Sequence, residues 1–503
     1  MTGHDVEGLL AARVLDALLR EDYAGLRRFV RGNTLELPGR SVRLVEARPA
    51  FLSTLVVDPG QGLRLRDVFH AVRLVADPRD DTASFERECR EALATIKLHD
   101  DARPAVHRRL GRLPAELRTG PGTFYETLAA YNDHPVHPAG RSRSGLSLAE
   151  LSRYAPEFAP SFPLRWAAVR NATRTGTLPG WWPAPSDVGL RLDDVDGALF
   201  PVHPLAARQV GSLPGVSLAP DPYLQVTPTL SMRTVAAAPL DHVKMPLPTS
   251  TLGLRNRRTI MPGTLPDGAL VERILRQVLS EEPSLPVLLA DEQTYGHADD
   301  PLLGYLVRPH RPCGGPTRRG TGPGSRHRTL GRRSALRRLP VGAALLERHA
   351  VPVRHRSGGA SAERRARLGR LSAPPPHQGQ RRRADRPVPL PGTRPALPRY
   401  EALARVFVTI TLHLCAAAPA LGLAERGLLP WRTGLRMIRE RLDQALGPQD
   451  AFLRARTLDA GTLPGKAMVT AGTLVDKART GAADINKHYG PPGPNYLLDT
   501  TCC

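Results

Sequence analysis

Residues Pro228–Arg258 read PTLSMRTVAAAPLDHVKMPLPTSTLGLRNRR, and apolar positions alternate with other positions around Lys244. A period of two residues is typical of a β-strand that packs on a core with one face. The apolar members of this alternation are Val243, Met245 and Leu247. The pattern predicts a β-hairpin at the edge of a sheet, with one face on the core and the other turned toward a polyanion.

The same stretch concentrates side chains that bind anions. Ser231, Arg233 and Thr234 offer two hydroxyls and a guanidinium within one turn, and Lys244 adds a point charge. Thr251 follows, and then come Arg255, Arg257 and Arg258. This set suits a triphosphate. A solvated basic hairpin is the alternative on spacing alone, because neither G-x-x-x-x-G-K-[ST] nor G-x-G-x-x-G is present.

A second candidate site is the histidine motif, Asp133–Gly145, which reads DHPVHPAGRSRSG. Each proline disfavours helix at the histidine before it, so both imidazoles lie on a stiff, extended segment. From there His137 could donate to a phosphate or to a carboxylate substrate. Arg141 and Arg143 are two residues apart and would lie on one side of a strand, where they could bind the same anion. The alternative is a His-Pro loop that is hydrogen-bonded to its own backbone.

These motifs resemble those of the siderophore synthetases that work without a nonribosomal peptide synthetase, the aerobactin-synthetase-like (IucA/IucC) family. PTLSMRT followed by HVKMPLPTSTLGLRNRRTI is similar to the family's nucleotide-binding segment, and the histidine motif is similar to its H-P-x-H-P-x-x-K-x-R-x-G. Pro156–Phe158 and Phe200–Pro204 fall where the family has P-E-[FY] and L-P-x-H-P-W-Q. The resemblance runs from about residue 10 to 308 and from about 400 to 497.

The chain departs from the family pattern at two places. Arg141 stands where the family usually has lysine, which keeps the charge and changes the geometry. Leu205 and Ala206 replace the Trp-Gln pair after His203-Pro204, so a functional role for His203 does not carry over directly.

Helical and strand-like runs are interleaved irregularly and without an internal repeat, which indicates an α+β fold. The resemblance implies a multi-lobed, hand-like synthetase with thumb, fingers and palm, and with mixed or antiparallel sheets. We expect a thumb-like lobe in residues 1–140 and a fingers-like nucleotide-binding lobe in 141–308. An aberrant Arg/Pro/Gly-rich segment would occupy 309–399, and 400–503 would form the helical C-terminal part of the palm.

By this resemblance the protein would condense a carboxylic acid with an amine, a hydroxylamine or an alcohol, using ATP and Mg²⁺. A carboxylate of citrate or of a succinyl derivative would attack the α-phosphate, and the acyl-adenylate would be captured as an amide or ester. Such a displacement depends on positioning and on charge neutralisation. An inactive family remnant and a basic nucleic-acid-binding protein are the alternatives.

The resemblance also assigns roles to residues. Ser231, Arg233 and Thr234 would contact the phosphates, with Lys244 beside the α-phosphate. The anion site would be completed by Thr251 and Arg258, with Arg257 as a rival for the last position. His137 and Arg141 would orient the nucleotide or the activated carboxylate. The Mg²⁺ ligands would come from the palm and cannot be named.

Positive charge is concentrated in one window of the chain. The sequence has a formal net charge of +22, and residues 311–399 contribute +19 through 22 arginines and three acids, which leaves +3 for the rest. The window has thirteen prolines and no Ile, Phe, Tyr, Trp or Met, so it cannot build a core. A nearly neutral remainder argues against nucleic acid as a partner.

Three interpretations of the window 311–399 stay open: a basic disordered insert, an arm that binds nucleic acid, and a stretch translated in the wrong frame. We favour the last. Five lysines against 65 arginines indicate a gene rich in G and C, and such DNA read out of frame encodes mainly Arg, Pro, Gly, Ala and Ser. The window also stands where the family's palm should contain an H-x-Q-N run, and it has none.

The remaining features point to the cytoplasm as the expected location. Its five cysteines are odd in number and form no C-x-x-C pair, which indicates neither a disulfide framework nor a zinc site. The N-terminus lacks the basic region of a signal peptide. Residues 407–424 are uncharged but favour a buried helix over a membrane span. The oligomeric state stays open, with a homodimer as one option.

Local patterns predict the remaining elements. Helical spacing covers 6–30, 84–118, 268–281 and 401–446, and short alternating runs within 34–67 indicate antiparallel strands. Ser147 followed by Glu150 predicts a capping box at the start of a short helix.

Overall fold

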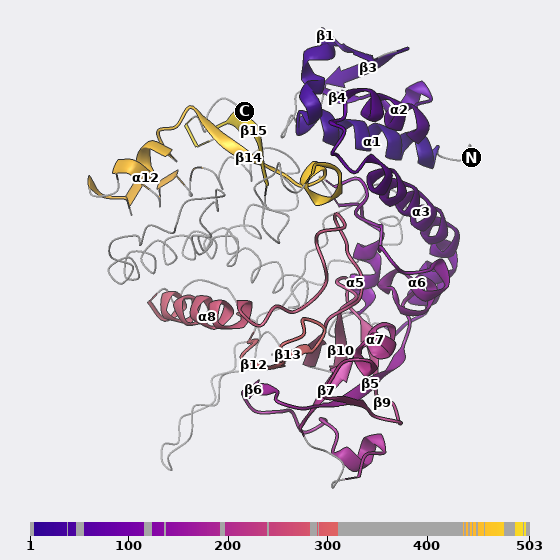
Figure 1. Ribbon diagram of the computed structural model, residues 1–503, viewed down its shortest axis with the longest axis vertical. Coiled ribbons are helices and arrows are strands. Elements are labelled where there is room, and N and C mark those ends of the chain that lie inside the picture. Colours follow the sequence, from indigo (N-terminus) through magenta and orange to yellow (C-terminus); the bar gives the residue numbers. More distant parts are fainter. Residues whose placement is uncertain are drawn as a thin grey trace, which may run out of the picture.

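The computed structural model describes residues 5–309, except 38, 47–54, 115–122, 135–136, 192–196, 239–240, 282–288 and 290, together with parts of 436–498. Helices and antiparallel sheets are mixed along the chain, which confirms the α+β prediction. Figure 1 shows an N-terminal lobe, a large sheet at the opposite end of the molecule, and the long helix α3 (Thr82–Gly111) running between them.

The N-terminal lobe packs three helices against a four-stranded antiparallel sheet. Helix α1 (Val6–Arg20) begins at Asp5, whose side chain accepts the Gly8 N–H at 3.0 Å. The core of the N-terminal lobe includes Leu15, Leu18 and Phe69. Helix α2 spans Leu65–Val75, and the strands are β1 (Val30–Arg31), β2 (Thr34–Leu37), β3 (Arg40–Glu46) and β4 (Leu55–Val57), paired in that order.

The predicted helix 6–30 is shorter than expected. It ends at Arg20 because Asp22, Ala24 and Gly25 adopt positive φ angles of 48°, 49° and 76°, which a right-handed helix cannot contain. A 3-10 segment, η1 (Tyr23–Phe29), replaces its last part.

Shorter helices connect the lobe to the large sheet. They are α5 (Thr123–Ala130), α6 (Leu148–Tyr154) and η3 (Pro156–Phe158). The predicted capping box opens α6: the Glu150 N–H donates to Ser147 Oγ at 3.2 Å, and the Ser147 N–H donates to Glu150 Oε2 at 2.8 Å. The predicted helix 268–281 is α8 (Thr264–Glu281).

The large sheet has nine antiparallel strands in the order β6-β12-β13-β11-β10-β9-β5-β7, with β8 paired to β5. Their bounds are β5 (Phe162–Val169), β6 (Thr173–Thr175), β7 (Ala198–Val202), β8 (Val216–Leu218), β9 (Tyr223–Pro228), β10 (Thr234–Ala238), β11 (Asp241–Lys244), β12 (Thr294–His297) and β13 (Gly304–Pro309). Short helices η4 (Pro185–Val188), η6 (Pro204–Ala206) and α7 (Ala207–Gly211) connect them.

The predicted hairpin exists as β10 and β11, with Thr234 opposite Lys244. Its predicted place at a sheet edge was wrong, because β9 pairs with β10 and β13 pairs with β11. Both faces are covered as well: Val243 and Met245 are fully buried, and Lys244 is 5% exposed. Neither strand of the hairpin therefore has a free edge.

A segment from the far end of the sequence completes the N-terminal lobe. Val469 and Leu474 belong to the same buried cluster as α1 and α2, and they lie at the two ends of a π-helix, η9 (Thr470–Leu474). Figure 1 shows this coil in yellow beside α3. The other described C-terminal elements are α12 (Ala451–Arg456) and the antiparallel pair β14 (Thr462–Ala467) and β15 (His488–Pro494).

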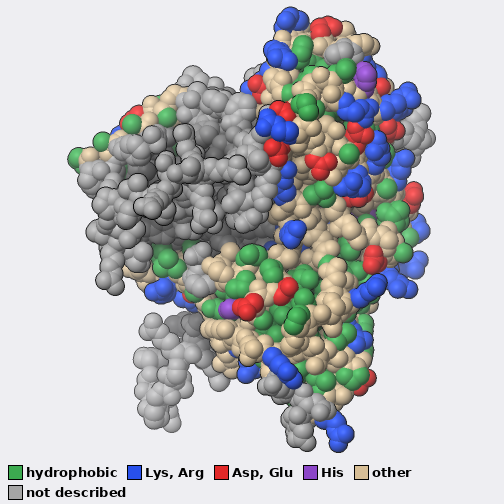
Figure 2. Space-filling model, viewed as in Figure 1, with side chains coloured by type: hydrophobic (Ala, Val, Ile, Leu, Met, Phe, Trp, Pro, Cys, Tyr) green, Lys and Arg blue, Asp and Glu red, His purple; other side chains and the backbone are tan. Residues whose placement is uncertain are grey.

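Several predictions concern residues outside the described part. These are the arginine-rich window 311–399, the apolar stretch 407–424, most of the helical region 401–446, and every cysteine except Cys89, which is buried and free. Among the described helices, none has the length and apolarity needed to cross a membrane. On the face in Figure 2, basic and acidic side chains are interspersed over the N-terminal lobe.

Candidate nucleotide-binding site

The turn between β9 and β10 gathers the first predicted phosphate ligands. The N–H and hydroxyl of Thr229 both donate to the Thr234 carbonyl, at 2.9 and 2.8 Å, and close the turn. Within it, Ser231 Oγ lies 3.0 Å from Thr234 Oγ1 and accepts the Thr234 N–H at 3.2 Å. Met232 has a positive φ of 61° and is 2% exposed, so its buried side chain fixes the turn to the core. The two hydroxyls are thereby held side by side.

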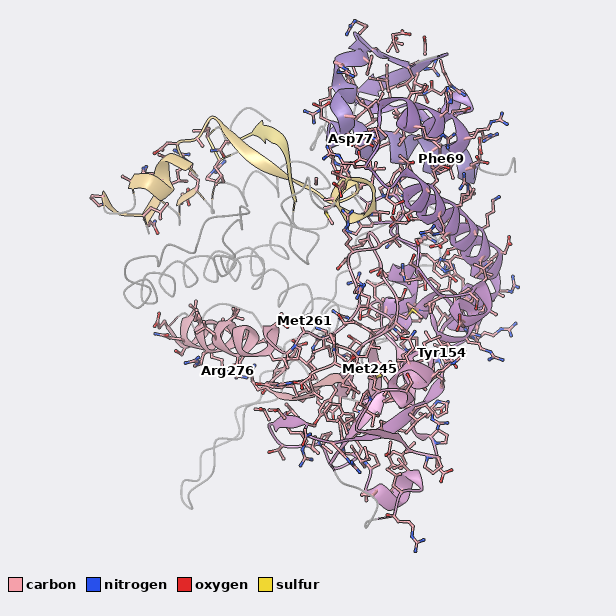
Figure 3. The ribbon with its side chains drawn as sticks, viewed as in Figure 1. Phe69, Asp77, Tyr154, Met245, Met261 and Arg276 are labelled. Carbon is pink, nitrogen blue, oxygen red and sulfur yellow. The ribbon has the colours of Figure 1, made fainter. Side chains whose placement is uncertain are left out.

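Lys244 and Arg233 lie at the same end of the hairpin. Lys244 is the cross-strand neighbour of Thr234, and directly opposed residues have Cβ atoms about 4.5–5.5 Å apart. The Arg233 carbonyl accepts the N–H of Met245 at 2.9 Å, and Figure 3 labels Met245 at this position. Arg233 Nη1 donates to the Thr259 carbonyl at 3.0 Å, which fixes the direction of its guanidinium.

Arg258 joins this group through the backbone. The Leu247 N–H donates to the Arg258 carbonyl at 2.9 Å, and the Arg258 N–H donates to the Thr249 carbonyl at 3.0 Å. Residues 257–259 thus run antiparallel to 247–249 and lie next to Arg233. Its rival Arg257 is exposed, whereas Arg258 is half-buried.

Thr251 lies in the loop that carries the chain from Ser250 to Arg257. It is 8% exposed, and its hydroxyl has no hydrogen-bond partner within the described structure. The loop turns sharply at Leu252 and Gly253, whose φ angles are 58° and 101°. Within the described part of the chain, the Thr251 hydroxyl therefore makes no hydrogen bond to the turn around Ser231.

The histidine motif is adjacent to this loop. The Ser144 N–H donates to the Ser250 carbonyl at 3.2 Å, and the Thr249 hydroxyl donates to the Ser144 carbonyl at 2.8 Å. The histidine motif and the stretch Pro228–Arg258 are therefore neighbours in the fold, although Thr249 and Ser144 are 105 positions apart in the sequence.

His137 is buried and neutral. It is 1% exposed, and burial, followed by the charges of His134 and Arg20, lowers its pKa to about 3. Its backbone N–H donates to His134 Nδ1 at 2.9 Å. Among the residues described, neither ring nitrogen has a partner. His137 can therefore serve as a neutral hydrogen-bonding group at pH 7, but not as a cation.

Arg141 is held by protein groups on three sides. Its Nε donates to Asp133 Oδ1 at 2.7 Å, its Nη2 donates to the Tyr131 carbonyl, and its Nη1 lies 3.2 Å from His99 Nδ1. The side chain of Arg141 is 7% exposed. Because its guanidinium is bound to these protein groups, Arg141 stabilises the conformation of the histidine motif.

Glu157, the acid of the Pro-Glu-Phe sequence, shares this buried cluster. It is 2% exposed, and burial raises its pKa while Arg143 and Arg141 lower it. His99 lies 3.8 Å from it, and burial together with Arg141 and Arg143 lowers the His99 pKa to about 3. The cluster thus brings the guanidiniums of Arg141 and Arg143 close to Glu157, with Asp133 bound to Arg141.

His203 has a structural role. It is fully buried, its Nδ1 accepts the Leu205 N–H at 3.2 Å as the N-cap of η6, and its ring packs edge-on against Tyr154 and Phe162. Burial lowers its pKa to about 3. None of these contacts involves the side chain of Leu205 or Ala206, so His203 can make them without the family's Trp-Gln pair.

Sequence reasoning missed three carboxylates that fix these segments. Glu126 on α5 accepts the Leu230 N–H at 2.8 Å, Glu88 on α3 accepts the Gly253 N–H at 2.9 Å, and Glu21 accepts N–H groups of η9. The one available signal was periodicity: Glu88 lies on the apolar face of α3, in register with Phe85 and Ala92.

The comparison with protein families covers both motifs. Residues 122–318 match the model of the IucA / IucC family, and the match ends eight residues into the arginine-rich window. This part of the chain is similar to the IucA/IucC family.

Relatives of this segment include a synthase and a ligase of Staphylococcus aureus. Staphyloferrin B synthase is 29% identical over 209 residues, which are 36% of this chain and 35% of that protein. The L-2,3-diaminopropanoate–citrate ligase is 30% identical over 138 residues, 23% of each protein. The structure of ATP-bound aerobactin synthetase IucA from Klebsiella pneumoniae aligns with a TM-score of 0.46 at 17% identity and covers 61% of each chain. The chain thus spans about a third or less of the length of these curated relatives.

Proposed function

We propose that the protein is an ATP-dependent siderophore synthetase that adenylates a carboxylate and condenses it with an amine, a hydroxylamine or an alcohol. The observation that carries the proposal is the pairing of buried Lys244 with Thr234 at one end of the β10–β11 hairpin, next to the β9–β10 turn that holds Ser231. An ammonium in a water-poor site attracts a phosphate more strongly than one in bulk water.

The proposed roles follow from this geometry. The hydroxyls of Ser231 and Thr234 would donate to phosphate oxygens, and Arg233, directed by Thr259, would neutralise their charge. Lys244 would stabilise the negative charge that grows at the α-phosphate while the carboxylate attacks. Arg258 lies next to Arg233 through its backbone contacts and would extend the site, and Thr251 would contribute from the adjoining loop.

The histidine motif would act beside the phosphates. His137, neutral at pH 7, would donate or accept a hydrogen bond at the nucleotide or the activated carboxylate. Arg141 would act through the backbone of the motif, because its guanidinium is engaged by Asp133, Tyr131 and His99.

Substrate class rests on the relatives. Since a matched relative is a diaminopropanoate–citrate ligase, citrate or a related polycarboxylate and a small amine are the proposed substrates. Mg²⁺ would neutralise phosphate charge when bound. The described residues contain no group of three His, Cys, Asp or Glu side chains that could hold a metal ion, so no step is assigned to it. We also propose that the thumb-like lobe ends at residue 140 and the fingers-like lobe at residue 308. The proposed location of the protein is the cytoplasm.

The test measures AMP released by the full chain from ATP, with and without citrate. Lys244→Met should lower citrate-dependent AMP release at least tenfold, which corresponds to about 1.4 kcal/mol of transition-state stabilisation. Lys97→Met, which removes an exposed lysine on α3, is the matched control and should leave the rate unchanged. Equal rates of AMP release for the two variants would refute the proposal. So would a rate of AMP release that does not change when citrate or another carboxylate is added.

A further inference from the structure

Glu88 joins two segments that are far apart in the sequence. Its Oε1 accepts the N–H of Gly253, in the loop that carries Thr251, at 2.9 Å. Its Oε2 accepts the hydroxyl of Thr473, in η9, at 2.6 Å. Glu88 is 3% exposed, so both hydrogen bonds are made away from water.

The loop and η9 also bind each other directly. The Leu254 N–H donates to Thr473 Oγ1 at 2.9 Å, and the Arg255 N–H donates to the Gly472 carbonyl at 3.1 Å. Arg255 Nη1 donates to the Ala471 carbonyl at 2.8 Å. A Cβ atom on Gly253 would lie 2.5 Å from Gly472 Cα, so the two backbones touch at a place where only glycine fits.

The other side of η9 is fixed to the N-terminal lobe. Glu21 accepts the N–H groups of Met468, Val469 and Thr470, and the Asp81 N–H donates to the Leu474 carbonyl at 2.8 Å. Since η9 is anchored there, any group that ties the loop to η9 also fixes the loop relative to the rest of the molecule.

We propose that Glu88 is a positioning residue: by tying the loop 251–256 to η9, it sets the position of Thr251 and Arg258 and thereby the affinity of the site for a nucleoside triphosphate. The effect on affinity rests on the function proposed above. The positioning itself does not.

The ionisation of Glu88 gives this link a measurable signature. Burial is the largest effect on the Glu88 pKa and raises it to about 7, although the hydrogen bonds from Thr473 and Gly253 act to lower it; the nearby charge of Glu91 adds to the rise. On the loop the charged neighbour is Arg255, whose guanidinium is bound to Ala471, and η9 itself contains no titratable side chain. Because burial makes the pKa of Glu88 higher in the closed arrangement than in an open, solvated one, a rise of pH through 7 should promote opening.

The experiment is hydrogen exchange of the amides of residues 253–255 in the full chain at pH 6 and pH 8, corrected for the intrinsic effect of pH. In the wild type, the opening equilibrium should increase about tenfold over this interval, if the pKa falls to its ordinary value on opening. Glu88→Gln keeps an acceptor without titrating and should remove this increase. Glu88→Ala should open the loop at both pH values, and Glu36→Gln on β2 is the control.

A second variant keeps the test decisive if Glu88→Ala does not fold. Gly253→Ala should open the loop at both pH values through its contact with Gly472. Gly39→Ala, which has a similar positive φ and no atom within 4 Å of the added Cβ, should leave it closed. Exchange that depends on neither Glu88 nor pH would overturn the positioning role.

ATP affinity is then measured for the same proteins by calorimetry. The affinity of the wild type should fall several-fold from pH 6 to pH 8 relative to Glu88→Gln. Exchange that follows Glu88 without any change in ATP affinity would overturn the link to nucleotide binding and would leave the Lys244 test unaffected, which separates the two failures.

Discussion

The carboxylate of Glu21 accepts both the backbone N–H and the hydroxyl of Thr470, at 2.8 and 2.7 Å, across 449 positions of the sequence. Its other oxygen accepts the N–H groups of Met468 and Val469 at 2.9 and 3.0 Å. The first N–H groups of a helix have no partner within the helix, so Glu21 serves as the N-terminal cap of η9.

Glu21→Ala should therefore destabilise the N-terminal lobe. Removing the acceptor leaves buried N–H groups unpaired, which costs about 1–3 kcal/mol, and should expose residues 468–476 to protease. Urea unfolding and limited proteolysis measure both effects. Glu36→Ala, at an exposed position on β2, is the control and should change stability by less than about 0.5 kcal/mol. Full stability of Glu21→Ala would show that the cap contributes little.

Replacing Arg141 by the family's lysine should destabilise this protein. A lysine ammonium cannot reach Asp133, the Tyr131 carbonyl and His99 together, because it is a single point and the guanidinium is a planar fork. The expected loss is about 1–3 kcal/mol in urea unfolding. Arg153→Lys, at an exposed position on α6, should be neutral. If Arg141→Lys is neutral too, the buried cluster tolerates a point charge.

Stability should fall as the pH decreases below 6.5, because His203 is neutral in the fold. Its folded pKa of about 3 lies below the ordinary value of 6.5, so the unfolded state takes up the proton first, and the contribution is present above pH 6.5 and lost below it. Between pH 7 and pH 5 this amounts to about 2 kcal/mol.

His203→Asn keeps a side-chain acceptor for the Leu205 N–H and does not titrate. Its stability relative to wild type should improve by that amount over the same interval, as measured by urea unfolding at each pH. His70→Asn, at an exposed position on α2, should show no such change. A constant difference between His203→Asn and wild type would mean that His203 is solvated.

Nucleic acid should bind only through the window 311–399. A chain that lacks these residues has a formal charge of +3 in place of +22 and should show almost no dependence of DNA affinity on salt. Fluorescence anisotropy at 50 and 200 mM salt compares it with the full chain, and circular dichroism confirms that it is folded. Steep salt dependence in the shortened chain would revive the alternative of a nucleic-acid-binding protein.

The coding DNA itself tests the frame interpretation of the window. Translated in the other two frames across codons 305–400, it should contain an H-x-Q-N run, and it should contain aromatic residues, which residues 311–399 of the present frame lack. Their absence from both frames would leave the insert and arm interpretations.

Local patterns predicted the elements whose causes are local. The Ser147–Glu150 box, α8 and the β10–β11 hairpin each depend on residues within one element. The central place of the hairpin was not predictable in the same way, since its neighbour β13 begins sixty residues after Lys244. Whether a strand is at an edge is decided by a partner, and the pattern of the strand itself does not record that partner.

The same distinction between local and long-range causes applies to the candidate site. The hydroxyl and basic side chains of the Ser231 turn could be predicted because they lie within one loop and have recognisable chemistry. The carboxylates that fix the loops could not, because Glu126 and Glu88 meet Leu230 and Gly253 across 104 and 165 positions. An acid on an apolar helix face is a signal of burial, but it does not name its partner.

The packing of Val469 and Leu474 into the N-terminal core bears on how the chain is made. Every other buried member of that core precedes residue 140. At a synthesis rate of about 5–20 residues per second, the ribosome needs roughly 15–65 s to translate the stretch between them. During that time the apolar surface that Val469 and Leu474 later cover is exposed on the nascent lobe. Ribosome-associated chaperones should therefore bind the growing chain, and they should release it when η9 emerges from the ribosome.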